Sequence, residues 1–210
     1  MPTTLMELDA ERRDAVLNAA LGEFASRGYA NASTNVIARE AGISKALMFH
    51  YVGSKRELFL SVDWFFRDLL RREYVEKMNL ADRDVIARLR QSFLLQITLA
   101  AQYPSILALE ALFEPTGDAD LDHELERRRV AGGPVSVPLF DGVDEERFRL
   151  EMAEGVGMRL VRWAAEGFAA HLLEAARRAS GLDAAGLAAE VEGFADDLRR
   201  ALYQGAGDLS

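Results

Sequence analysis

The side chains that could perform chemistry in this sequence gather in one short stretch, residues 34–57. From residue 34 to residue 56 the stretch holds four cations and a single acid. These charged residues are Arg39, Lys45, Lys55, Arg56 and the acid Glu40. Lysine and arginine neutralise DNA phosphates, and small or apolar side chains can rest against thymine methyl groups. The mixture of residues in this stretch therefore favours contact with nucleic acid.

Residue types typical of enzyme active sites are too widely spread to form a recognisable site. The three histidines, His50, His123 and His171, lie far apart, and none has a partner at metal-ligand spacing. The sequence has no cysteine, phosphate-loop lysine, dinucleotide glycine motif, nucleophile elbow or paired Glu-x-x-His. We therefore expect no catalytic residues, no metal and no cofactor.

Two short helices joined by a tight turn would position the charged stretch. Ile37, Ala38 and Ala41 fall on one helical face, and Gly42 can leave the helix in a left-handed conformation. Ile43 then places an apolar side chain inside the turn. This pattern predicts a helix-turn-helix.

The second of these helices would begin after Ser44, whose side chain can cap it. Met48 and Val52 are spaced i, i+4 toward the interior. The residues left facing outward are Lys45, Ala46, Leu47, Phe49 and His50. After Gly53, the run from Ser54 to Glu57 has the form of a capping box and predicts the start of a third helix.

This region resembles the DNA-binding head of the tetracycline-repressor (TetR) family of bacterial transcriptional regulators. The similarity covers roughly residues 10–60 and is most specific in AGISKALMFHYVGSKREL. It implies that Thr34, Tyr51 and Lys55 hold phosphates. It also implies a row that faces bases, namely Lys45, Ala46, Leu47, Phe49 and His50. The family more often has Gly-Thr-Leu-Tyr where this chain has Ala-Leu-Met-Phe at 46–49, which removes two hydroxyl groups that could bind phosphate.

The rest of the chain has the apolar spacing of helices. We predict helices over 9–27, 54–79, from 82 or 84 to 104, 104–113, 121–130, 144–179 and 184–203, with an irregular loop over 134–142. The helix 54–79 would span about 39 Å at ~1.5 Å per residue and link the head to the body as a stiff lever.

Charge is unevenly distributed along the 210 residues, whose formal net charge is -9. Residues 1–60 hold 7 basic and 7 acidic residues, whereas residues 61–210 hold 18 and 27. The acidic excess therefore lies in the body and does not argue against DNA binding by the head. Half of the residues are apolar, but no run is long enough to span a membrane, and the N-terminus lacks the features of a signal peptide. We expect a cytoplasmic protein.

Two features of the body predict a ligand site and a dimer interface. Aromatic residues could line an apolar cavity for a small-molecule effector or could equally be packed core. The candidate lining is Trp64, Phe65, Phe93, Ile97, Phe113, Trp163 and Phe168.

The helix 144–179 carries a stripe of mostly small residues, Ala153, Gly157, Leu160, Ala164, Gly167 and His171. With the near-heptad pattern of 184–203, this stripe predicts a four-helix seam between two copies, blocked by a bulky residue at Gly157.

Together these patterns predict an all-α protein with two domains. A three-helix helix-turn-helix head (residues 1–53) would bind DNA, and a C-terminal helical bundle (54–210) would bind an effector and form a homodimer. The resemblance implies a repressor that binds a double-stranded, palindromic operator and is released by a small apolar or amphipathic molecule. Two alternatives are a small-molecule-binding bundle or enzyme without specific DNA binding, and a structural DNA-binding protein without an effector.

Overall fold

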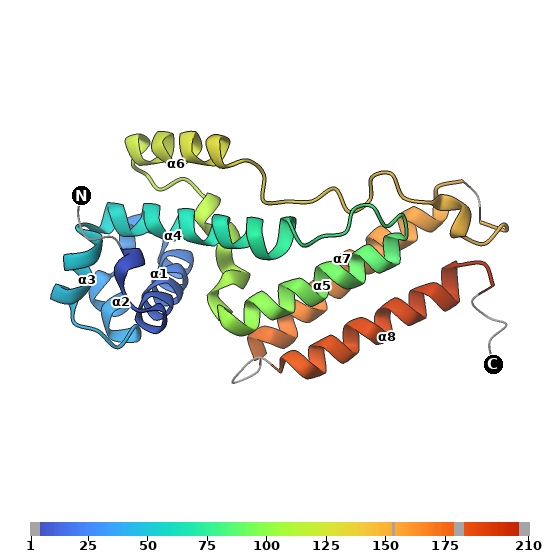
Figure 1. Ribbon diagram of the computed structural model, residues 1–210, viewed down its shortest axis with the longest axis horizontal. Coiled ribbons are helices and arrows are strands. Elements are labelled where there is room, and N and C mark those ends of the chain that lie inside the picture. Colours follow the sequence, from blue (N-terminus) through green and yellow to red (C-terminus); the bar gives the residue numbers. More distant parts are fainter. Residues whose placement is uncertain (1–4, 153, 179–182, 206–210) are drawn as a thin grey trace. The chain divides into compact units, whose positions relative to one another are not determined.

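The computed structural model describes residues 5–152, 154–178 and 183–205 (Figure 1). Its elements are η1 (Leu5–Glu7), α1 (Ala10–Asn31), α2 (Thr34–Glu40), α3 (Lys45–Val52), α4 (Lys55–Leu70), η2 (Arg71–Val75), α5 (Val85–Gln102), η3 (Pro104–Phe113), α6 (Ala119–Gly132), η4 (Glu145–Arg147), α7 (Val156–Arg178) and α8 (Ala184–Leu202). Within the described ranges every element is a helix, apart from one isolated bridge between Phe148 and Tyr203. The all-α fold predicted from the sequence is confirmed.

The chain packs as two compact units. The first consists of Met1–Arg72 and Gln102–Val135, and the second of Glu73–Ala101 and Ser136–Ser210. The predicted boundary between residues 53 and 54 separates functions rather than packing units, and it stays a prediction. No single described helix is long and apolar enough to cross a membrane, although α5 and η3 satisfy length and composition as a bent pair.

The helices α1 to α4 of the first unit surround one apolar core. Asp9 caps α1 by accepting the backbone N–H of Arg12 at 3.0 Å. Gly28 interrupts α1 with φ 70° and ψ 163°, at the position where the sequence predicts its end. The fully buried side chains of this core include Val16, Leu17, Leu21, Phe24, Ile37, Met48, Leu58 and Phe66. Because one face of each helix is buried in this core, apolar residues recur at helical spacing through the first 70 residues, and this spacing is what predicts the helices.

The helix α4 is shorter than the sequence predicts. It ends at Leu70 after 16 residues, which is about 24 Å at ~1.5 Å per residue, and continues only as the π-helical turn η2. Charged residues replace the apolar face after Leu70, and Arg71 and Arg72 both turn back to Asp68. The prediction of one continuous helix to Asn79 is therefore wrong, and with it the single stiff lever of that length.

Charged side chains hold α6 against α4 inside the first unit. The Arg129 guanidinium donates to Oδ1 of Asp63 at 3.1 and 2.8 Å, and Asp63 is only 2% exposed. Arg129 also donates to the carbonyl of Leu112 at 2.8 Å. Farther along α4, Arg67 donates to the backbone carbonyls of Arg129 and Gly133. The charge of Asp63 is thus paired and hydrogen-bonded, as a buried carboxylate requires.

In the second unit, α5, α7 and α8 share one core of aliphatic and aromatic side chains. Its fully or nearly fully buried members include Val85, Ile86, Leu89, Phe93, Val161, Leu187, Val191 and Ala195. The rings of Phe168 and Phe194 stack at 4.1 Å between centroids, which joins α7 to α8. The sequence predicts the inward face of α5 and the extent of α8 correctly.

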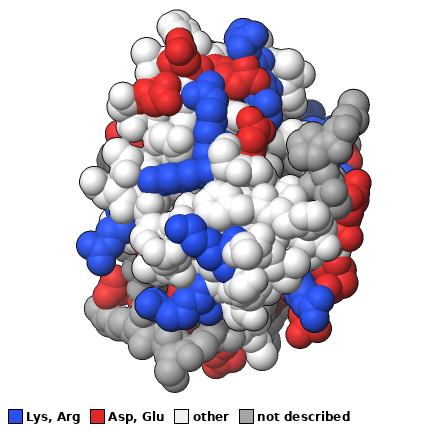
Figure 2. Space-filling model, turned by 90° about the vertical axis from the view of Figure 1, so that its left-hand side faces the viewer, with Lys and Arg blue, Asp and Glu red and all other residues white. Residues whose placement is uncertain are grey.

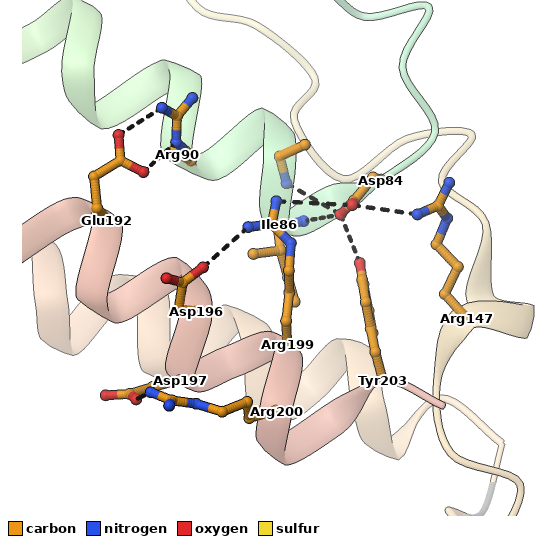
Figure 3. A network of polar contacts seen from close by, with 11 residues as sticks. Asp84, Ile86, Arg90, Arg147, Glu192, Asp196, Asp197, Arg199, Arg200 and Tyr203 are labelled. Carbon is orange, nitrogen blue, oxygen red and sulfur yellow. Dashed lines mark hydrogen bonds and ion pairs between the residues drawn. The ribbon is translucent and has the colours of Figure 1, made fainter. Parts of the chain in front are cut away.

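A buried carboxylate, Asp84, organises one end of this unit (Figure 3). Its Oδ1 accepts the Tyr203 hydroxyl at 2.8 Å and the backbone N–H of Ile86 at 2.9 Å, so it caps α5 and fixes the end of α8. Arg147 lies 3.3 Å and Arg199 3.9 Å from its Oδ2. Burial, followed by the hydrogen bond to Asp84, raises the pKa of Tyr203 above its usual range.

The helix α7 begins at Val156, so the predicted start at Asp144 is wrong. Residues 147–149 instead pair with the end of α8, because the Arg149 N–H donates to the Leu202 carbonyl and the Gln204 N–H donates to the Arg147 carbonyl, both at 2.9 Å. A Cβ on Gly157 would lie 2.5 Å from the Phe148 ring. Gly157 is therefore packed within one chain, and substituting it cannot test a dimer as the sequence suggested. Ala153 and residue 179, which the sequence predictions also used, lie outside the described residues.

Candidate nucleic-acid interface

The turn between α2 and α3 is built by Gly42. This residue has φ 68°, and its N–H donates to the Arg39 carbonyl at 3.0 Å while the next N–H, of Ile43, donates to the Ala38 carbonyl at 3.0 Å. These two bonds form the glycine-terminated end of a helix known as a Schellman motif. Ile37 and Ala38 are buried beneath it. The predicted helix-turn-helix geometry is confirmed.

Both ends of α3 are capped, which fixes the register of its outward face. Ser44 Oγ accepts the Leu47 N–H at 3.1 Å, and the N–H of Gly53, with φ 72°, donates to the Phe49 carbonyl at 2.8 Å. Met48 and Val52 are buried, as their spacing predicts. Ser54, which follows Gly53, caps α4, because its Oγ accepts the Glu57 N–H at 3.1 Å.

The residues predicted to face bases lie together on the outer side of α3. Lys45, Ala46 and His50 are exposed, and Leu47 and Phe49 are half-buried. The Lys45 ammonium lies 5.7 Å from the centroid of the Phe49 ring. A lysine beside an aromatic ring keeps its charge and its three hydrogen-bond donors available to a partner. The face thus offers one cation surrounded by small and apolar surface.

The three residues implied as phosphate contacts are all half-buried. Thr34 is the first residue of α2, and the ring of Tyr51 meets that of His50 edge-on at 5.2 Å. Lys55 already has an internal partner, because its ammonium donates to the Ala30 carbonyl at 3.0 Å and lies 5.1 Å from the Tyr29 ring. A phosphate would have to compete with these contacts. The roles of all three residues stay predictions.

Most cations of the head are already engaged. Arg12, Arg13 and Arg39 pair with acids one or three residues away in the sequence. Among the described residues of the head and the first turn of α4, Arg27, Lys45 and Lys55 have no carboxylate within ion-pair distance, and of these Lys55 is held by the Ala30 carbonyl. Figure 2 shows the side of the molecule on which α1 to α3 lie, where separate Lys and Arg side chains border an uncharged area. The positive charge available to DNA is modest, and Lys45 is its centre on α3.

Sequence reasoning missed one contact of the interface region. Arg56, on the first turn of α4, lies 3.3 Å from Oδ2 of Asp118, whose Oδ1 caps α6. Burial raises the pKa of Tyr29, nearby Asp118 adds to the rise, and Arg56 opposes it. The partners Arg56 and Asp118 are 62 residues apart, so no local pattern could have revealed the pair.

The residues predicted to line one effector cavity are divided between the two units. Trp64, Phe65 and Phe113 belong to the first unit, and Phe93, Ile97, Trp163 and Phe168 to the second. Phe65, Phe93 and Ile97 are buried, whereas Trp64 is 50%, Phe113 42% and Trp163 63% exposed. A common cavity for all seven stays a prediction.

Nothing in the described ranges suggests a metal centre. No group of three or more histidine, cysteine, aspartate or glutamate side chains could hold an ion there. In the described structure, the Nε2 atom of His171 lies 2.6 Å from a carboxylate oxygen of Glu190, on the exposed surface of α7 and α8.

Part of the chain matches a known protein family. Residues 16–62 match the model described as bacterial regulatory proteins, tetR family. Two curated relatives carry the name HTH-type transcriptional regulator BetI. The protein from Agrobacterium fabrum is 46% identical over 61 residues, which is 29% of this chain and 30% of the relative. The protein from Rhizobium meliloti is 35% identical over 130 residues, 62% of each chain. The matched segments thus span less than two thirds of either relative.

Solved structures resemble the chain over nearly its whole length. The ketosteroid transcriptional regulator KstR2 of Mycobacterium tuberculosis aligns with a TM-score of 0.56 at 18% identity, covering 94% of this chain and 97% of the other. A TetR family transcriptional regulator from Chloroflexus aurantiacus aligns with a TM-score of 0.51 at 18% identity, covering 95% and 97%. At this level of identity the likeness concerns the fold alone.

Proposed function

This chain belongs to the TetR family of bacterial transcriptional regulators, and from that premise we propose that it represses transcription by binding a palindromic operator as a homodimer. We further propose that a small molecule bound by the chain releases it from DNA. An enzymatic role is not part of this proposal.

The observation that supports DNA binding most directly is the outer face of α3. There Lys45 presents a cation without a carboxylate partner in the described structure, next to exposed Ala46 and His50. Capping at both ends holds α3 in one register, so these side chains reach a groove together. A helix of this kind in the major groove contacts base edges through a few outward side chains. We assign base contacts to Lys45, Ala46, Leu47, Phe49 and His50, and phosphate contacts to Thr34, Tyr51 and Lys55.

The test begins with selection of duplexes from a random pool by the purified chain, followed by affinity measurements at several salt concentrations. Lys45→Ala should cost ~1 to 3 kcal/mol mainly on the selected site, because it removes a base contact. Lys55→Ala should weaken all duplexes similarly and lower the salt slope by about one. Lys77→Ala is the matched control, since Lys77 pairs with Glu73 in the second unit. Failure to select any site would reject the proposal, and a changed sequence preference in Lys55→Ala would reject its phosphate role.

The outer side of α7 supports the homodimer. Leu160, Trp163, Gly167 and His171 follow one another at helical spacing, and all four are exposed. Trp163 is 63% exposed, and an aromatic ring of this exposure is typical of a contact surface. A Cβ on Gly167 would meet nothing within 4 Å, so this position allows a second helix to come close.

Sedimentation velocity tests this interface. We expect Trp163→Glu to convert the dimer to a monomer, because a buried unpaired carboxylate opposes association. The matched control is Leu150→Glu, which introduces the same charge at an 86% exposed position of the same unit, outside the α7 stripe. A Trp163→Glu protein that remains a dimer at every concentration would reject the interface.

A further inference from the structure

A cavity of about 250 Å³ lies in the first unit between α4 and α6. Its walls include Trp64 and Arg67 from α4, Arg128 from α6, and Val135 beyond the end of α6. Pockets for drug-sized ligands measure roughly 300–1,000 Å³. This cavity therefore suits a smaller molecule, about the size of one substituted ring.

The two acids that also line the cavity are already paired. Asp63 accepts both the Nε and an Nη donor of Arg129, and Asp68 accepts the Nε of Arg72 at 2.8 Å as well as Arg71. Because each carboxylate has its cation, the cavity does not present free negative charge. A cationic ligand would have to break one of these pairs.

Three arginines line the cavity, and two of them, Arg67 and Arg128, supply its positive character, because Arg71 pairs with Asp68. Arg67 donates only to backbone carbonyls, those of Arg129 and Gly133, so no carboxylate in the described structure balances its charge. Arg128 shares the single carboxylate of Glu124 with Arg127. A guanidinium forms paired hydrogen bonds with a carboxylate or a phosphate, because its planar geometry matches both anions. The small volume of the cavity and its aromatic wall favour a ring that carries a carboxylate.

The apolar side of the cavity is aromatic. Trp64 is 50% exposed although it sits on a helix whose neighbours Asp63 and Phe65 are buried. Val135 adds an aliphatic wall, and a Cβ on Gly132 would meet nothing within 4 Å. A flat ring can therefore lie against the indole, where stacking adds to the area it buries.

We propose that this cavity binds a small aromatic carboxylate, with its ring against Trp64 and Val135 and its carboxylate on Arg67 and Arg128. Binding itself does not depend on the proposed function. Its role as the releasing effector does rest on that function. In that role the anion would draw Arg67 away from the backbone carbonyls of Arg129 and Gly133, which tie α4 to the end of α6. A change in α4 could reach the proposed DNA-contacting helix α3, because α4 begins three residues after α3 ends. The ligand can shift DNA affinity only as far as it favours one arrangement of α4 and α6.

Tryptophan fluorescence tests the site, because the chain has two tryptophans. Trp163→Phe leaves Trp64 as the sole reporter, and the DNA-free protein is titrated with benzoate, phenylacetate and 3-phenylpropionate. We expect at least one of them to cause a saturable change, with Kd on the order of 0.1 to 1 mM for so small a ligand. The corresponding neutral amides are the matched probes, and they should bind roughly tenfold more weakly or not at all. If none of the three acids changes Trp64 fluorescence by roughly 10 mM, the proposal is overturned.

Neighbouring arginines give a matched pair of variants. Arg127→Gln and Arg128→Gln each remove one partner of Glu124, but only Arg128 lines the cavity. In the Trp163→Phe background, Arg128→Gln should weaken carboxylate binding about tenfold and Arg127→Gln should leave it nearly unchanged. Equal effects of the two variants would place the ligand elsewhere and overturn the site.

A separate titration of the protein–DNA complex distinguishes the two proposals. Release of operator by the carboxylate, lost in Arg128→Gln and kept in Arg127→Gln, would support the effector role. Binding to Trp64 without any change in operator affinity would overturn the effector role and leave the site standing. A chain that selects no operator, yet binds the carboxylate, would overturn the proposed function alone.

Discussion

Removing the guanidinium of Arg129 should destabilise the first unit strongly. In Arg129→Met the Asp63 carboxylate, 2% exposed, would lose both of its arginine donors at 3.1 and 2.8 Å. The Leu112 carbonyl would lose its donor as well. Breaking a buried pair on one side costs roughly 3 to 5 kcal/mol. Since the Arg129 side chain is 16% exposed, some water can reach the vacated place, and we expect about 3 kcal/mol.

The double variant separates the charge from the packing. Asp63→Leu combined with Arg129→Met replaces the pair by apolar side chains and should be within about 1 kcal/mol of the original protein, because no charge is left buried alone. Urea unfolding followed by Trp64 fluorescence in the Trp163→Phe background reports on the first unit, since Trp64 lies on α4. The slope of unfolding free energy with urea should stay the same in all variants.

Two outcomes would refute this reasoning. A loss below about 1 kcal/mol in Arg129→Met would mean that Asp63 is not desolvated as the structure indicates. A double variant as unstable as the single one would mean that packing by the arginine, rather than its charge, holds α6 to α4. The neighbouring change Arg128→Met serves as the control and should have little effect, because that side chain pairs with Glu124 at the surface.

Three further outcomes are expected. In denaturant unfolding, Gly157→Ala should destabilise the second unit by ~1 to 3 kcal/mol, because the new Cβ would lie 2.5 Å from the buried Phe148 ring. Gly167→Ala should instead stabilise helix α7 by ~0.5 to 1 kcal/mol, because a Cβ there meets nothing within 4 Å. The raised pKa of Tyr203 adds stability that is complete below about pH 10 and falls as pH rises further, because the unfolded chain loses the phenolic proton first. Tyr203→Phe should lessen that alkaline fall in thermal midpoints measured from pH 8 to 11, and an unchanged fall would contradict it. Asp118→Asn keeps the cap on α6 but removes the negative charge beside Arg56. Arg56 would then be free to neutralise one more phosphate, so the salt slope of DNA binding should steepen by about one. An unaltered slope would show that Arg56 reaches no phosphate.

Local chemistry made the head predictable from the sequence. The Ser44 cap of α3 and the Gly42 end of α2 each depend on bonds to residues at most five positions away. The inward faces of α2 and α3 follow from spacing over the same short distance, as buried Ile37 and Met48 show. Signals of this range are contained in any window of a dozen residues, so they can be read without the tertiary structure.

Contacts between distant segments were not predictable in this way. The early end of α4 depends on where its apolar face loses its packing partner. The late start of α7 depends on residues 147–149, which pair with the end of α8. Asp63 and Arg129 are 66 residues apart, and each looks like an ordinary surface charge in the sequence. Tertiary packing overrides helical spacing at such places.

The two packing units are interleaved along the chain, which crosses from one unit to the other after Arg72, Ala101 and Val135. On the ribosome, α1 to α4 emerge early, but η3, whose Ser105 N–H bonds to the Asn18 side chain at 3.0 Å, is made only after α5. The first unit therefore has to wait for residue 135 before its core can close. A fragment ending at residue 72 would contain α3 but would leave the apolar faces of α1 and α4 uncovered. We expect chaperones to bind such a fragment, so it should not behave as an independently folded domain.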